Sequence, residues 1–125
     1  MEKPKILACD FDGTLATYGP GQWPRIGEPQ RELNGGRVID RVKQYKANGW
    51  QVILWTCRSG KYLQDAVDWC ANLGLTFDAI NKNTESIGER EASSQGVNSV
   101  DELSPKIYAT YYLDDKNVTI EEFMK

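Results

Sequence analysis

Residues 6–15 read Ile-Leu-Ala-Cys-Asp-Phe-Asp-Gly-Thr-Leu, a short apolar run that ends at two aspartates and a glycine. A continuous apolar run of this length is typical of a central strand of a parallel sheet, which is buried on both faces. Gly13 permits a sharp turn directly after the strand. We therefore expect the carboxylates of Asp10 and Asp12 at the carboxyl end of that strand, where open α/β sheets bind their ligands.

Downstream of this strand the pattern alternates between helices and strands. Apolar spacing predicts one helix from Val38 to the Asn48-Gly49 pair and another over residues 63–73. Buried strands are predicted at residues 51–55, 77–80 and 107–113, and a capping box at Thr119 predicts a short helix in the tail. Residues 81–105 are polar and show little periodicity. The alternation predicts one α/β domain over residues 1–125, a Rossmann-like three-layer sandwich with a central, mainly parallel sheet.

Residues 16–34 carry several prolines and glycines and are predicted to form a long ordered loop or small hairpin. The segment follows the aspartate pair, so its start is held near the mouth of the predicted cleft, where it could act as a flap. Trp23 lies in this segment without a strand or helix pattern to bury it. Two interpretations stay open: Trp23 is a platform for a ring of the substrate, or it packs on the core and anchors the loop.

Composition excludes several classes of function. The 125 residues contain no histidine, so Ser-His-Asp and Cys-His nucleophile systems and an imidazole base are absent. Three cysteines without a CxxC spacing indicate neither a disulfide framework nor a zinc site, and they suit a reducing compartment. The first apolar run is too short for a signal peptide or a membrane span, so we expect a cytoplasmic protein with no membrane partner. A net charge of -3 gives no strong positive field for nucleic acid.

Polar clusters follow three of the predicted strands, at residues 10–14, 56–58 and 114–115. The carboxyl ends of parallel strands meet at one edge of a sheet, so these clusters predict a cleft rich in carboxylates. Such a cleft would be unstable without a cation. The sequence therefore implies a divalent metal.

The chain resembles the haloacid dehalogenase-like (HAD) superfamily of phosphatases. Residues 6–15 are similar to its first motif, a strand followed by DxDGT, and the other motifs are matched in order by Thr56, Lys106 and the Asp114-Asp115 pair. The resemblance spans nearly the whole chain. It implies a phosphatase that hydrolyses phosphate monoesters through an aspartyl-phosphate intermediate.

The resemblance also implies a role for each matched residue. Asp10 would be the nucleophile, and Asp12 would be the general acid and base. Mg²⁺ would be held by Asp10, by the backbone carbonyl of Asp12 and by Asp114, with Asp115 as a further ligand or an orienting acid.

Thr56 would donate a hydrogen bond to the phosphoryl oxygens, and Lys106 would neutralise their charge. Lys82 and Lys116 are alternative candidates for the lysine. Arg58 follows Thr56 closely and either contacts the phosphate or substrate, or forms a salt bridge within a loop.

No cap domain fits between the motifs, so the site is expected to be open. It could accept a phosphorylated small molecule or a nucleic-acid end, or a neighbouring subunit of a homo-oligomer could cover it. A cysteine phosphatase is excluded because none of the cysteines has an arginine six residues later. The alternatives to the enzyme are a receiver-like phospho-acceptor domain, whose motifs occur in another order, and a non-catalytic HAD-like binding module.

Overall fold

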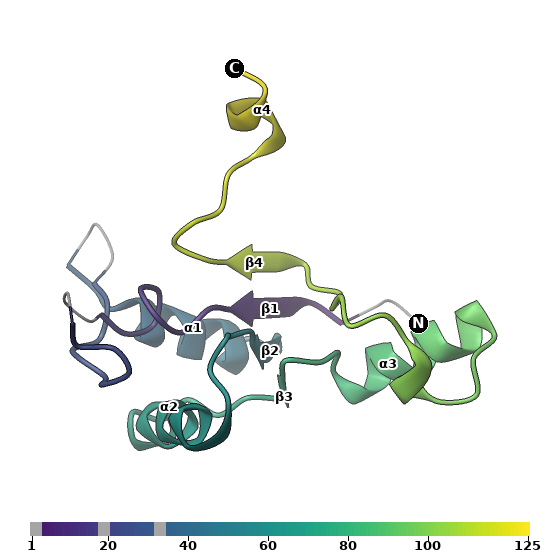
Figure 1. Cartoon of the computed structure of the whole chain (residues 1–125), viewed down its shortest axis with the longest axis horizontal. Coiled ribbons are helices and arrows are strands. Elements are labelled where there is room, and N and C mark those ends of the chain that lie inside the picture. The colour runs from purple at the N-terminus through teal and green to yellow at the C-terminus, as the bar shows by residue number, and fades with distance from the viewer. Residues whose placement is uncertain (1–3, 18–20, 32–34) are drawn as a thin grey trace.

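A four-stranded parallel sheet forms the centre of the computed structural model, which describes residues 4–17, 21–31 and 35–125 (Figure 1). Its strands are β1 (Ile6–Cys9), β2 (Gln51–Leu54), β3 (Ala79–Ile80) and β4 (Tyr111–Leu113), and their order across the sheet is β3-β2-β1-β4. Every pairing is parallel. The predicted α/β class and parallel sheet are therefore confirmed.

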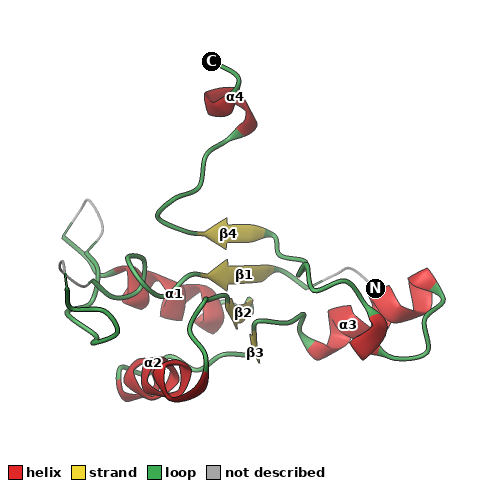
Figure 2. Cartoon of the chain, in the orientation of Figure 1, coloured by secondary structure: helices red, strands yellow, loops and turns green. Residues whose placement is uncertain are grey.

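Side chains alternate along β1, so apolar residues face both sides of the sheet, and helices cover both sides. Leu7 and Cys9 pack with residues of α1 (Val38–Ala47) and α2 (Gly60–Asn72) in the larger apolar cluster. Ile6 and Ala8 belong to a second cluster, which Ile87 of α3 (Glu85–Gln95) completes. Figure 2 shows the helices around the strands of the sheet. This layering places the first motif strand at the centre of the core.

The structure differs from the predicted elements in three segments. The polar segment 81–105 contains α3 and a short 3-10 helix, η1 (Val100–Glu102), which were not predicted. The last strand was predicted from residue 107 but β4 begins at Tyr111, because the backbone N–H of Tyr108 donates to the Asn83 side chain instead of to a neighbouring strand. The third strand is only two residues long rather than four.

The loop after β1 returns on itself as a small hairpin. The Thr17 N–H donates to the Glu28 carbonyl at 2.8 Å, and the Gln30 N–H donates to the Leu15 carbonyl at 3.1 Å. This agrees with the predicted ordered loop or hairpin, although residues 18–20 and 32–34 of the predicted flap lie outside the described residues. The strands β1 and β4 run toward the side on which this loop lies (Figure 1).

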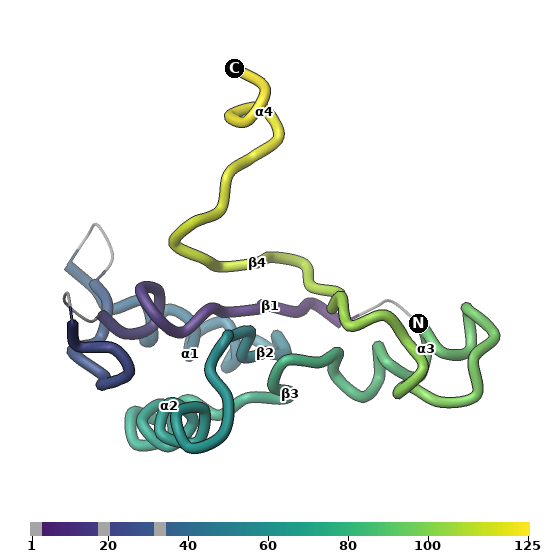
Figure 3. The backbone as a smooth tube through the Cα atoms, in the orientation of Figure 1, coloured from purple at the N-terminus to yellow at the C-terminus, as the bar shows by residue number. Residues whose placement is uncertain are grey.

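The tail carries the predicted short helix, α4 (Ile120–Phe123), whose Thr119 hydroxyl oxygen accepts a hydrogen bond from the Glu122 N–H. The tail extends away from the sheet, and Ile120 and Phe123 are exposed (Figure 3). Among the described residues, no helix combines the length and the apolar character that crossing a membrane requires.

Candidate functional site

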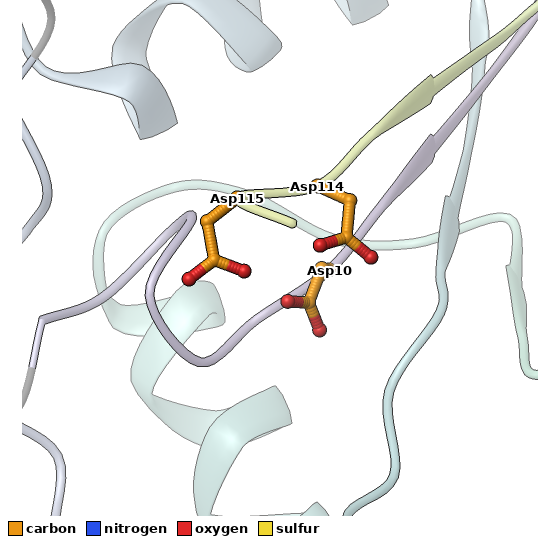
Figure 4. A group of neighbouring side chains, drawn as sticks. All are labelled: Asp10, Asp114 and Asp115. Carbon is orange, nitrogen blue, oxygen red and sulfur yellow. The ribbon is translucent and has the colours of Figure 1, made fainter. Parts of the chain in front are cut away.

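The register between β1 and β4 brings two distant acidic segments together. Cys9 lies opposite Leu113, and the Asp10 N–H donates to the Leu113 carbonyl at 2.9 Å. Asp10 and Asp114 therefore leave their strands side by side. One carboxylate oxygen from each of Asp10, Asp114 and Asp115 lies within 4.8 Å of the others, and the three side chains surround a common space (Figure 4).

Gly13 allows the turn after β1 to approach the Asp115 carboxylate. Its φ is +82°, a conformation that glycine adopts without strain. A Cβ atom at this position would overlap the Asp115 carboxylate. Both the backbone conformation and the space that the Asp115 carboxylate occupies therefore favour glycine at position 13.

The cluster carries more negative charge than its surroundings balance. Burial, with the nearby charges of Asp114, Asp115 and Asp12, raises the pKa of Asp10 to about 6, although the N–H of Phe11 opposes this shift. Lys116 lies 3.0 Å from Asp115 and lowers the pKa of that carboxyl. Oxygen ligands and excess negative charge fit a hard divalent cation, so the three carboxylates could hold a metal ion.

Asp12 is turned toward Arg58. The Nη2 atom of Arg58 lies 2.7 Å from Asp12 Oδ1, and its Nε atom lies 2.9 Å from Oδ2. The Arg58 side chain is only 1% exposed, and its Nη1 also donates to the Pro24 carbonyl at 2.9 Å. Arg58 therefore connects the acid of the first motif to the loop that follows it, which is the salt-bridge interpretation of this residue; contact with a phosphate stays a prediction.

Thr56 is fixed at the end of β2 by two hydrogen bonds. Its backbone N–H donates to Asn81 Oδ1 at 2.8 Å, and its hydroxyl oxygen accepts from the Arg58 N–H at 3.1 Å. Asn81 follows β3 with a φ of +54° and donates its own N–H to the Leu54 carbonyl. Thr56 thus lies at the same edge of the sheet as Asp10.

Lys106 is not brought to this edge by any contact among the described residues. It lies before β4, beside a hollow that Asn83 and Tyr108 also line, whereas the acidic cluster follows the other end of that strand. Lys82 follows β3 after Asn81 and lines a hollow together with residues of α3 and η1. The choice between these lysines stays a prediction.

Trp23 lies beside the Arg58 guanidinium. The distance from that group to the centroid of the Trp23 ring is 5.9 Å, and the Phe11 ring lies 5.1 Å away. The Tyr62 ring contacts Trp23 at a centroid distance of 5.6 Å. Trp23 nevertheless stays 51% exposed, so it is not packed into the core.

Burial raises the pKa of the Cys9 and Cys70 thiols to about 12, so neither is a nucleophile near neutral pH.

Two residues of this region were not predicted from the sequence. Asn81 was missed because it begins the polar segment 81–105, although its place directly after a strand was a usable signal. Tyr62 was missed because it occupies an exposed position of α2 and nothing in the sequence links it to Trp23.

The comparisons with known proteins give one match to a solved structure. No family model matches the sequence, and no curated protein matches it. The structure of a conserved protein from Bacteroides thetaiotaomicron aligns with a TM-score of 0.69 and 30% sequence identity. The match covers 93% of this chain and 79% of the Bacteroides chain. On this identity and coverage, the chain belongs to the same family as the conserved Bacteroides protein.

Proposed function

We propose that the chain is a Mg²⁺-dependent phosphatase that hydrolyses phosphate monoesters through an aspartyl-phosphate on Asp10. The observation that carries this proposal is the meeting of Asp10 with Asp114 and Asp115 within 4.8 Å, across two paired strands. The resemblance of residues 6–15 and of the Asp114-Asp115 pair to the HAD superfamily supports the same reaction. The proposal covers small phosphorylated molecules and nucleic-acid ends as substrates.

Asp10, Asp114 and Asp115 would hold the ion, with the backbone carbonyl of Asp12 as a further ligand. When bound, Mg²⁺ neutralises the carboxylates and the phosphoryl oxygens, so that an anionic nucleophile can approach an anionic ester.

The reaction has two displacements at phosphorus. In the first, a carboxylate oxygen of Asp10 forms a bond to phosphorus, the ester P–O bond breaks, and Asp12 gives a proton to the departing oxygen. In the second, water attacks the same phosphorus, Asp12 takes a proton from it, and the bond to Asp10 breaks. Inorganic phosphate and the alcohol are the products, and both aspartates return to their starting state.

Arg58 controls when Asp12 can take part. Both carboxylate oxygens of Asp12 accept hydrogen bonds from Arg58. At least one of these bonds must loosen before Asp12 can exchange a proton with the leaving group or with water. We therefore assign Arg58 a positioning role in addition to any contact it makes with the phosphoryl group.

Thr56 would donate its hydroxyl hydrogen to a phosphoryl oxygen. Its hydroxyl oxygen already accepts from the Arg58 N–H, so the hydroxyl hydrogen is left for a different partner. A lysine would balance the remaining charge. Lys106 is the residue that the motif order indicates, and Lys82 and Lys116 are the alternatives.

The test is turnover of a generic aryl phosphate by the purified protein with Mg²⁺. We expect continuous release of phosphate, and we expect Asp10→Asn to reduce it by several orders of magnitude because a neutral amide does not attack phosphorus. Asp101→Asn, on the exposed η1 helix, is the matched control and should keep the wild-type rate. Full activity of Asp10→Asn would contradict the mechanism.

The same assay separates the two alternatives. A receiver-like domain would be labelled at most once by a small phosphodonor, without continuous release. A non-catalytic module would bind a phosphorylated ligand without releasing phosphate at all.

A further inference from the structure

Two exposed aromatic side chains lie beside the candidate site. Trp23 is 51% exposed and Tyr62 is 44% exposed, and their rings meet at 5.6 Å with an interplanar angle of 62°. They come from different elements, the loop after β1 and the helix α2. An apolar pair exposed at a polar edge leaves area that a ligand could remove from water.

Contacts with Arg58 hold the Trp23–Tyr62 pair in place. The buried Arg58 guanidinium lies over the Trp23 ring, and Arg58 also donates to the carbonyls of Pro24 and Tyr62. One side of the indole therefore faces a buried cation, and the exposed area belongs to the remainder of the ring. A ring whose position is fixed before binding loses little conformational entropy when a ligand stacks on it.

The distance between Trp23 and Asp12 limits the size of the ligand. Arg58 contacts Asp12 at 2.9 Å and lies 5.9 Å from the Trp23 centroid, so the indole lies within about 10 Å of the Asp12 carboxylate. A ring attached directly to the phosphoryl oxygen would stay close to Asp10. A ring separated from the phosphate by a sugar can extend to Trp23.

We propose that Trp23 and Tyr62 form a stacking surface for the base of a nucleoside monophosphate, which makes nucleotides the substrate class of this site. This inference rests on the proposed phosphatase function. It makes that function more specific, because the leaving group would carry a planar ring that a sugar separates from the phosphate. The base would be recognised by stacking, so several bases would be accepted.

The experiment compares substrates that share the phosphate and the sugar. Hydrolysis of a 5′-nucleoside monophosphate and of ribose 5-phosphate is measured with Mg²⁺, and 4-nitrophenyl phosphate reports on the chemistry alone. We expect kcat/KM for the nucleotide to exceed that for ribose 5-phosphate by roughly ten- to a hundredfold, the usual worth of one stacked base. Equal values of kcat/KM for the nucleotide and for ribose 5-phosphate would overturn the proposal.

Variants locate the effect on the two rings. Trp23→Ala and Tyr62→Ala should each lower the ratio of nucleotide to ribose 5-phosphate kcat/KM toward one, mainly through KM, and Trp23→Phe should restore part of it. Phe123→Ala is the matched control, because Phe123 is an exposed aromatic of the tail, away from the sheet (Figure 3). A preference for nucleotides that survives both alanine variants would assign the base to another surface and overturn the proposal.

Binding separates this inference from the proposed reaction. If no ester is hydrolysed, calorimetric titration of the wild-type protein with adenosine 5′-monophosphate and with ribose 5-phosphate still tests the surface. Tighter binding of the nucleotide, lost in Trp23→Ala, would support the stacking surface while the phosphatase function fails. Hydrolysis of all three esters without any effect of a base would leave the phosphatase function standing and remove the stacking surface.

Discussion

Asp12 and Arg58 form the best-connected ion pair of the site, and the pair has two consequences at the scale of single residues. Arg58 is almost fully buried, so its charge depends on Asp12 for compensation. Asp12 in turn is held away from bulk water by the same hydrogen bonds. We therefore expect a change of either residue to affect both the proposed proton relay and the stability of the protein.

Asp12→Asn should separate these consequences. The amide oxygen can still accept a hydrogen bond from Arg58, so the variant should fold, but it cannot exchange a proton. We expect turnover to fall by roughly 10²- to 10⁴-fold, the usual worth of a general acid–base. The measurement is kcat for esters whose leaving groups differ in basicity, and the loss should be greatest for the poorest leaving group. An unchanged rate with an alkyl phosphate would refute the assignment.

Asp12→Ala goes further because it leaves the Arg58 guanidinium buried without a carboxylate. Removing one partner of a buried ion pair typically costs about 3–5 kcal/mol of the free energy of unfolding. Since Asp12 is itself 18% exposed, we expect a loss at the lower end of that range. Urea denaturation of Asp12→Ala beside the wild-type protein measures it, and equal midpoints for the two proteins would show that Arg58 does not depend on the carboxylate.

The acidic cluster could be predicted from the sequence, because parallel strands place their carboxyl ends at one edge and Asp10 and Asp114 each follow such a strand. The hydrogen-bond partners of Arg58 could not be predicted from the sequence. Its hydrogen bonds run to Asp12, Pro24 and Tyr62, and which of these an arginine reaches depends on the path of a loop. The sequence alone left a phosphate contact and a salt bridge as alternatives for this reason.

At the scale of elements, β4 shows why an apolar segment need not be a strand throughout. Residues 107–113 have strand-forming composition, yet only Tyr111–Leu113 pair with β1. Ile107 is buried by packing against Ile6 and Ile87 without joining the ladder. The apolar composition of residues 107–113 indicates burial, and Ile107 is buried. It does not indicate the hydrogen bonds that define a strand.

The helix α3 was missed for the opposite reason. Its sequence is mostly polar, and only Ile87, Gly88 and Ala92 are buried. A Cβ atom at Gly88 would lie 3.1 Å from a methyl carbon of Val100, so the two elements approach closely at this position. A glycine in a polar helix weakens the periodic signal, so the packing of Ile87 in the core and of Gly88 against Val100 is visible only in three dimensions.

The end of β4 supplies Asp114 to the proposed metal site. Asp114 leaves this strand beside Asp10, so Asp114→Asn should remove one negative ligand while leaving the nucleophile intact. We expect the Mg²⁺ concentration for half-maximal activity to rise by about tenfold or more, with a smaller loss at saturating Mg²⁺. A Mg²⁺ dependence identical to that of the wild-type protein would contradict the assignment of this strand end to the metal.

At the scale of the whole molecule, the ionised carboxylate of Asp10 opposes folding when no cation is bound. The pKa of Asp10 is raised to about 6 in the folded protein, whereas an unfolded chain ionises it near its ordinary value of 3.8. Between these two values the folded state binds more protons than the unfolded state. The free energy of unfolding therefore falls as pH rises through this window, and the loss from Asp10 is complete above about pH 6.

Mg²⁺ should reverse that loss, because it binds the ionised carboxylates of the folded state and not the unfolded chain. Binding at a hundredfold excess over the dissociation constant stabilises a protein by about 2.7 kcal/mol, which raises Tm by about 10 °C for a domain of 125 residues. We expect that rise at pH 7.5 and a much smaller one at pH 5, where protons on Asp10 compete with the ion. Thermal denaturation at both pH values, with and without Mg²⁺, measures the effect. Asp10→Asn should lose part of the pH dependence between 4 and 6 and most of the rise with Mg²⁺, while Asp101→Asn should keep both. A Tm that responds to Mg²⁺ equally at both pH values, or equally in Asp10→Asn, would place the ion away from Asp10.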